Sequence, residues 1–180
     1  TERSKVNGQS LPLPTNSDSY VLVEIMQLKS VNMENIWYWW WDILYSDWDL
    51  YNKYYLNQPC GVITDDTGNI YVADAGNQRI VKYSNDGKTL AVWGERGTGD
   101  NKFLFPFGIA IDNDSGWCYV VDRDNAYIQK FDLEGNLIRR WGDWGTVDTS
   151  FNQPTHIYVD RKSHNLFIID SLNHRMLSFN

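Results

Sequence analysis

The chain has 180 residues, of which 42% are hydrophobic and 22% are charged, and its formal net charge is −7. This composition is typical of a soluble globular protein of about one domain. The negative charge disfavours nucleic acid as a partner, because phosphates are bound mainly by Lys and Arg. No run approaches the ~20 apolar residues that a membrane helix needs, so we expect no membrane span.

Residues 1–18 are expected to form an extended arm or linker, since Pro12 and Pro14 exclude a regular helix there. Residues 19–57 form an aromatic-rich segment, and its first part, Ser19–Leu28, alternates as a strand does. We interpret the remainder of this segment as a degenerate strand or as a degenerate blade of the repeat fold described below. Its aromatic side chains could also offer a flat surface to a protein chain or a carbohydrate. The candidate surface residues there are Trp37, Trp39, Trp40, Trp41 and Trp48.

Residues 58–180 consist of a repeat that occurs three times, at 58–104, 105–152 and, truncated, 153–180. Asp74, Asp122 and Asp170 follow one another at intervals of 48 residues, and Trp93 and Trp141 have the same spacing. A fixed period of this length with strand-like content is typical of a repeat architecture such as a propeller.

Each complete repeat predicts four short strands separated by tight turns, and the third repeat predicts three. The Asp-Gly pair at Asp86-Gly87 favours a hairpin with a type I′ turn. The predicted strands are 61–64, 69–73, 79–83 and 89–93, then 109–112, 117–121, 127–131 and 137–141, then 157–160, 166–169 and 176–179.

Four antiparallel strands per repeat describe one blade of a β-propeller, so we predict an all-β fold. Closed propellers need ~4–8 blades, which is more than residues 58–180 supply. We therefore expect an incomplete propeller, or one that other chains complete. A strand at Tyr20–Leu28 that joins the last blade is a third option.

These residues resemble the NHL repeat family over about 58–180. The pattern is fullest in the first repeat, and the third has His156 where glycine is expected. The resemblance implies a β-propeller, and it implies no single activity, because this fold serves many functions. The matching stretches are Pro59-Cys60-Gly61-Val62, Gly68–Asp74, Asn77-Gln78-Arg79-Ile80, Pro106-Phe107-Gly108-Ile109, Tyr119–Asp122, Phe167–Asp170 and Asn173-His174-Arg175.

One set of polar residues recurs with the repeat, and its side chains suit the turn between the second and third strands. We interpret this set as structural. Three positions that break the pattern, Arg123, Tyr127 and His156, are candidates for a ligand or partner surface. The structural set is Asp74, Asn77, Arg79, Asp122, Asn125, Asp170, Asn173 and Arg175.

No cofactor or metal is expected. The histidines His156, His164 and His174 match no short zinc motif. Peptide-amidating lyases that resemble this family place zinc-binding His directly after the inner-strand Pro, and here those places hold Cys60, Phe107 and Thr155. Calcium could bind the Asp-rich turns at 65–68 and 112–116, although they lack a full calcium-loop series.

The sequence therefore favours a non-enzymatic β-propeller module that acts as a protein-interaction or assembly surface. Its expected partner is protein, either by self-association or as other chains that complete the propeller. Two alternatives remain open: a metal-dependent lactonase- or lyase-like enzyme, and an RNA-binding propeller. The acceptor triplet Asn113-Asp114-Ser115 favours an extracellular or secreted setting.

Overall fold

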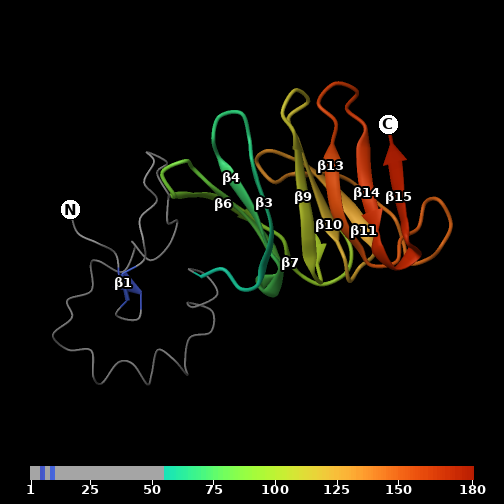
Figure 1. Ribbon diagram of the computed structural model, residues 1–180, viewed down its shortest axis with the longest axis horizontal. Helices are drawn as coiled ribbons and strands as arrows, with labels where there is room; N and C mark the ends of the chain where they lie inside the picture. Colours follow the sequence, from blue (N-terminus) through green and yellow to red (C-terminus); the bar gives the residue numbers. More distant parts are fainter. Residues whose placement is uncertain (1–4, 7–8, 11–54) are drawn as a thin grey trace, which may run out of the picture.

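The computed structural model describes residues 5–6, 9–10 and 55–180 (Figure 1). Their regular structure is β-strand apart from two 3-10 helices, η3 (Ala75–Asn77) and η4 (Ser171–Asn173). Within this part of the chain, no helix is long and apolar enough to cross a membrane. Near the N-terminus, β1 (Lys5–Val6) and β2 (Gln9–Ser10) pair as antiparallel strands.

Residues 59–179 form three antiparallel sheets that stand side by side, as Figure 1 shows. We call them blades 1, 2 and 3. Blade 1 contains β3 (Pro59–Thr64), β4 (Ile70–Asp74), β5 (Arg79–Tyr83) and β6 (Thr89–Trp93) in that order. Blade 2 contains β9 (Pro106–Asp112), β10 (Trp117–Asp122), β11 (Tyr127–Asp132) and β12 (Leu137–Trp141). Blade 3 contains β13 (Pro154–Val159), β14 (Leu166–Asp170) and β15 (Arg175–Phe179).

The predicted strands agree with the observed ones to within a few residues at each end. The predicted turn type at Asp86-Gly87 is wrong. Type I′ needs a positive φ at both central residues, and here Gly87 has φ 84° while Asp86 is not in the left-handed region. The amide of Gly87 donates to Ser84 O, and the amide of Ser84 donates to Lys88 O. Thus β5 and β6 are joined by a longer hairpin loop, and their register shifts beside it.

Two apolar cores lie between the blades, one on each face of blade 2. Strand residues alternate between these faces, as the period of two requires. The core between blades 1 and 2 contains Tyr71, Ala73, Ile80, Trp93, Phe103, Ile109, Ile111, Cys118, Val120 and Phe131. The core between blades 2 and 3 contains Ala110, Tyr119, Val121, Ala126, Ile128, Phe151, Ile157, Val159, Leu166 and Ile168.

The segments that connect successive blades also contribute to these cores. The first contains a short parallel pair, β7 (Glu95–Arg96) and β8 (Lys102–Phe103), and places Phe103 in the core with no exposed surface. Gly94 has φ 92°, and a Cβ there would lie 2.5 Å from the Phe103 ring. Gly142 stands in the same relation to Phe151. The glycine after each repeat tryptophan therefore turns the chain and leaves room for the phenylalanine.

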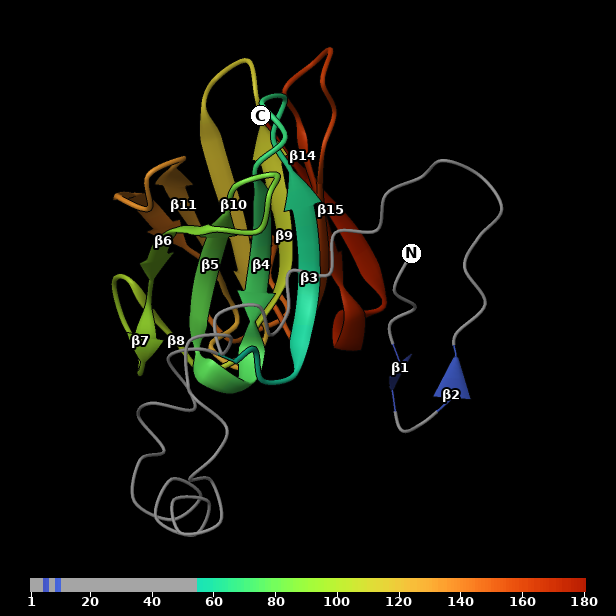
Figure 2. The same cartoon turned by 90° about the vertical axis from the view of Figure 1, so that its left-hand side faces the viewer.

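The first strands of the three blades, β3, β9 and β13, lie next to one another, and Figure 2 shows β3 beside β9. Glycine allows their backbones to approach closely. A Cβ on Gly61 would lie 2.6 Å from Phe107 O, and a Cβ on Gly108 would lie 2.4 Å from Thr155 O. His156 occupies the corresponding position of blade 3 and is exposed. We call the contacts of blade 2 with blades 1 and 3 the internal joints. At this end they are thus tighter than a contact of another sheet with the outer side of blade 3 could be.

Candidate functional site

The recurring polar residues form buried corners where the second strand of a blade meets the third. Asp74, with no exposed surface, accepts hydrogen bonds from Asn77 Nδ2 at 2.8 Å and from Arg79 Nε at 2.7 Å. It also accepts from the amide of Asn57 at 2.6 Å. Arg79 Nη2 donates to Tyr55 O. This corner therefore ties the chain that enters blade 1 to the second and third strands of that blade, which is a structural role.

The corner of blade 3 repeats this geometry. Asp170 accepts from Asn173 Nδ2 at 2.7 Å, from Arg175 Nε at 2.8 Å and from the amide of Asn152 at 2.7 Å. The guanidinium of Arg175 also donates to three carbonyl oxygens of residues 146–150. The connecting segment before blade 3 is held in this way.

In blade 2, Tyr127 replaces the arginine of this corner. Its hydroxyl accepts from Asn125 Nδ2 at 2.7 Å and contacts Lys102 O at 3.0 Å. Asp122 accepts instead from the amides of Leu104 and Phe105, both at 2.9 Å. Burial raises the pKa of Tyr127 to about 12, and the charge of Asp122 adds to this shift. Tyr127 is buried, so it anchors the connecting segment without a charge and is not available at the surface.

Arg123 and His156, the other two positions that break the pattern, lie near the start of the inner strands. The guanidinium of Arg123 stacks over the Phe105 ring at 4.1 Å and pairs with Asp124 at 2.7 Å. The ring of His156 meets Phe107 edge to face, with centroids 5.8 Å apart. The structure thus brings Arg123 and His156 to one aromatic patch and separates Tyr127 from both.

The cysteines are both free thiols. Cys118 is buried in the core between blades 1 and 2, whereas Cys60 is exposed. Burial raises the pKa of Cys118, which leaves a neutral thiol that packs as a small apolar group. The five tryptophans of the aromatic-rich segment, Trp37, Trp39, Trp40, Trp41 and Trp48, lie outside the described residues.

The turns between the first and second strands meet at the opposite end of the blades. The amide of Asp66 donates to Asn113 Oδ1 at 2.9 Å, and Arg161 pairs with Asp66. A pocket of about 290 Å³ lies beside these turns. It is lined by Asp65, Asp66, Thr67, Asn69, Lys82, Asn113, Leu133 and Glu134. Lys82 Nζ donates to Leu133 O at 3.0 Å, so this ammonium group is already engaged.

Asp65 is the cap of the turn in blade 1. Burial opposes its charge, but hydrogen bonds from Thr67, Asn69 and Tyr71 outweigh burial and lower the pKa of Asp65 to about 2. Its folded-state pKa thus lies below the ordinary value of about 3.9. Such a group stabilises the fold above pH ~4, and this contribution is lost as the pH falls through ~2.

We therefore expect wild type to be more stable than Asp65→Asn by about 2 kcal/mol at pH 7. The difference should shrink steadily as the pH falls from 4 to 2, as measured by urea unfolding at each pH. Asp148→Asn is the control, because the side chain of Asp148 is fully exposed and its surface pair with Arg175 at 3.8 Å should contribute only about 0–1 kcal/mol, so this variant should stay close to wild type. A pH-independent difference for Asp65→Asn would contradict the assignment.

The outward face of blade 3 is an exposed apolar surface. Tyr158 is 61% exposed, Ile169 41% and Met176 60%, and Phe167 lies half-buried beside Tyr158 with ring centroids 6.4 Å apart. We call these four residues the open face. They come from all three strands of the blade, which makes the surface continuous.

The same repeat positions are buried in blade 2, and in blade 1 three of them are buried and the fourth, Ile63, is half-buried. The exposed fractions of Ala110, Val121 and Ile128 in blade 2 are 5%, 0% and 0%. Tyr119, the counterpart of Phe167, is also buried. All four counterparts pack against blade 3. The open face therefore repeats the side chains of an internal joint, and only its neighbour is missing among the described residues.

Sequence reasoning missed the open face. The signal was present in the aligned repeats, because Tyr158, Phe167, Ile169 and Met176 stand in register with strand positions of the second repeat. Alternation within one strand does not distinguish a face that packs on the preceding blade from one that packs on a following blade. Only the order of the sheets in space makes this distinction.

Comparison with known proteins agrees with the architecture. The NHL repeat family matches residues 56–83. The chain is 35% identical over 65 residues to NHL repeat-containing protein 3 of Homo sapiens, covering 34% of this chain and 19% of that protein. For the Mus musculus protein the values are 38% over 64 residues, 34% and 18%. The chain thus matches about a fifth of the length of these relatives.

Two solved structures show the same fold. The RRP9 WD40 repeats superpose with a TM-score of 0.53 at 16% identity, covering 68% of this chain and 39% of that chain. An auxiliary nutrient binding protein from Bacteroides thetaiotaomicron gives a TM-score of 0.52 at 17% identity, with 65% and 36% covered. These likenesses confirm the all-β fold of propeller blades, and the described residues supply three blades, fewer than a closed propeller needs. At such identities they carry no information about function.

Proposed function

We propose that this chain, whose residues 56–83 form an NHL repeat and whose sheets are β-propeller blades, is a non-enzymatic module that binds protein through the open face of blade 3. The observation that carries the proposal is the exposure of Tyr158, Ile169 and Met176 at positions that are buried in blade 2 and buried or half-buried in blade 1. Exposed contiguous apolar surface of this kind marks an interaction site.

The chemistry of the open face favours protein over nucleic acid. The outward positions of β13, β14 and β15 carry no Lys, Arg, Asp or Glu between His156 and Ser178. Phosphate binding depends on Lys and Arg, whereas an uncharged aromatic and aliphatic sheet face suits another sheet face. The RNA-binding alternative is therefore disfavoured at this surface.

We propose a second copy of this chain as the occupant, because the first and fourth strands of blade 1 leave Val62 and Val92 of the complementary face exposed, although Val72 and Val81 between them are 7% and 2% exposed. Val62 is 67% exposed, while its repeat counterparts Ile109 and Ile157 are 8% and 9% exposed and pack against the preceding blade. Blade 1 of one copy could then pack on blade 3 of another. Two copies would supply six blades, within the ~4–8 blades of closed propellers.

The test is the oligomeric state in solution. Light scattering after size exclusion should show wild type well above the 21.0 kDa of one chain, and increasingly so at higher concentration. The double variant Ile169→Lys/Met176→Glu should have the mass of a single chain. Ile138→Lys is the matched control, because Ile138 is 50% exposed on β12 and lies outside the open face.

A mixing experiment tests the pairing of the two faces. Val62→Glu blocks the face of blade 1, and Ile169→Lys/Met176→Glu blocks the open face, so each variant alone should be monomeric. An equimolar mixture should form a dimer, because each variant retains the half that the other lacks. Dimerisation of Val62→Glu by itself would instead indicate packing of two open faces. A strictly monomeric wild type would refute the proposal.

A further inference from the structure

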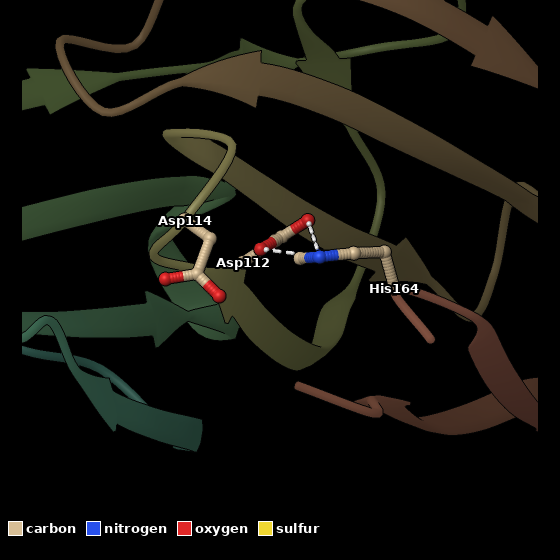
Figure 3. A group of neighbouring side chains, drawn as sticks. All are labelled: Asp112, Asp114 and His164. Atoms are coloured by element: carbon tan, nitrogen blue, oxygen red, sulfur yellow. Dashed lines mark hydrogen bonds and ion pairs between the residues drawn. The ribbon is translucent and has the colours of Figure 1, made fainter. Parts of the chain in front are cut away.

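Three metal-ligating side chains meet where blade 2 adjoins blade 3. Asp112 ends β9, Asp114 lies in the turn after it, and His164 lies in the equivalent turn of blade 3 (Figure 3). His164 Nδ1 lies 3.0 Å from Asp112 Oδ2 and 3.2 Å from Asp112 Oδ1. One ligand atom from each residue lies within 4.8 Å of the others. The donors thus come from two blades and converge on one point.

The carboxylate of Asp112 has few hydrogen-bond donors for a buried charge. Asp112 is only 5% exposed. Among the described residues, its Oδ1 accepts from Ser115 N at 3.3 Å, the Ser115 side chain also bonds to the carboxylate, and His164 Nδ1 lies 3.0 Å from Oδ2. A carboxylate removed from water requires donors or a cation. Outside the cluster, the hydrogen bonds that the described residues donate to the Asp112 carboxylate therefore come from Ser115 alone.

The equivalent aspartate of blade 1 is satisfied in another way. Asp65 accepts hydrogen bonds from Thr67, Asn69 and Tyr71, and these cover both of its carboxylate oxygens. In blade 2, Trp117 and Tyr119 hold the positions of Asn69 and Tyr71 in the aligned strands. The small number of hydrogen-bond donors to Asp112 is thus a property of this one site and not of the repeat.

His164 also departs from the repeat. It has φ 59°, and the matching turn of blade 2 has Gly116 with φ 71°. Glycine adopts this conformation without steric cost, while histidine is uncommon there. The consequence is that a side chain with two ring nitrogens reaches across to the buried carboxylate of the neighbouring blade, as Figure 3 shows.

We infer that Asp112, Asp114 and His164 form a binding site for a divalent first-row transition ion, of which Zn²⁺ is the best representative. Zn²⁺ takes His nitrogen and Asp oxygen ligands at about 2.0–2.2 Å, and three protein ligands leave one position for water. Two atoms bound to one such ion lie at most about 4.4 Å apart. The ligand atoms lie within 4.8 Å of one another, so the exposed carboxylate of Asp114 would have to move slightly closer to bind the ion. The imidazole favours such an ion over calcium, which prefers oxygen ligands only.

The experiment is titration of metal-free full chain with ZnCl₂ by calorimetry, together with elemental analysis after dialysis. Wild type should bind one ion per chain. His164→Gly should weaken binding at least about 100-fold, beyond the 10–100-fold typical of residues that only support a ligand. Glycine also restores the residue that the matching turn of blade 2 uses, so the variant is expected to fold, which circular dichroism checks.

His174→Asn is the matched control. His174 is exposed with φ 51°, a conformation that asparagine tolerates, so this variant should retain the wild-type affinity. The inference is overturned if wild type does not retain Zn²⁺, or if His164→Gly binds it as tightly as wild type. Tight binding of CaCl₂ that His164→Gly retains would identify an oxygen-only calcium site at 112–116 and would also overturn it.

Discussion

The variant Asp74→Ala is expected to lose about 3–5 kcal/mol of unfolding free energy, because it breaks a buried ion pair and leaves a charge without its partner. Asp74 has no exposed surface, and the side chain of Arg79 is 13% exposed. The variant also leaves the amide of Asn57 without its acceptor and removes one of the two acceptors of Asn77 Nδ2. Urea unfolding followed by tryptophan fluorescence would measure the loss.

Asp100→Ala is the control for this prediction. Asp100 pairs with Arg140 at 3.0 Å, but its side chain is 72% exposed. Surface pairs contribute about 0–1 kcal/mol, so this variant should unfold almost as wild type does. Equal losses for the two variants would show that the Asp74 corner does not depend on burial.

The variant Gly108→Val should destabilise the chain by about 3 kcal/mol, at the upper end of the range for overpacking. A Cβ at this position would lie 2.4 Å from Thr155 O and 3.2 Å from His156 Cα. Both contacts are with backbone, so blades 2 and 3 would have to separate near the start of β9 and β13. The midpoint of thermal unfolding provides the measurement.

His156→Ala is the matched control, because it changes the same repeat position on the outward side of blade 3. A side chain is already accommodated there, so the effect should stay within about 0.5 kcal/mol. If Gly108→Val proved as mild as His156→Ala, the close approach of the inner strands would not be required for stability.

The fold was predictable because two features of the sequence indicate it: the fixed period of the repeat and the turn residues within each repeat. The spacing of Asp74, Asp122 and Asp170 located the blades, and the observed strands follow the predicted ones closely. The NHL resemblance is confirmed over 56–83. The type I′ turn was wrong because dipeptide preference does not determine loop length, which the pairing of β5 with β6 sets here.

The connecting segments were predicted less well. Phe103 and Phe151 are fully buried, yet they lie in the connecting segments, outside the strands that the sequence predicts. They pack against Gly94 and Gly142, which directly follow the last strands of blades 1 and 2. Tyr127 was assigned to a surface because it breaks the repeat, whereas the structure shows that it replaces the arginine within the corner.

The candidate sites required the arrangement in space. The Asp112–His164 contact arises between blades, where residues about 50 positions apart meet, and the open face follows from the order of the sheets in space. Spacing rules for zinc consider ligands that are close in sequence, so His164 was not paired with Asp112. The prediction that Trp37 and its neighbours form a partner surface stays a prediction, because that segment lies outside the described residues.

His156 has a consequence for any sheet that packs on the open face. Its Cβ occupies the space that Gly61 and Gly108 leave empty in the internal joints, so the incoming backbone must stay farther out at that end. If copies of this chain associate through the open face, each copy would consequently contribute two close contacts between its own blades and one wider contact with the next copy, the splayed contact. Under mechanical load or dilution, such an assembly should come apart at the splayed contact and release intact three-blade units.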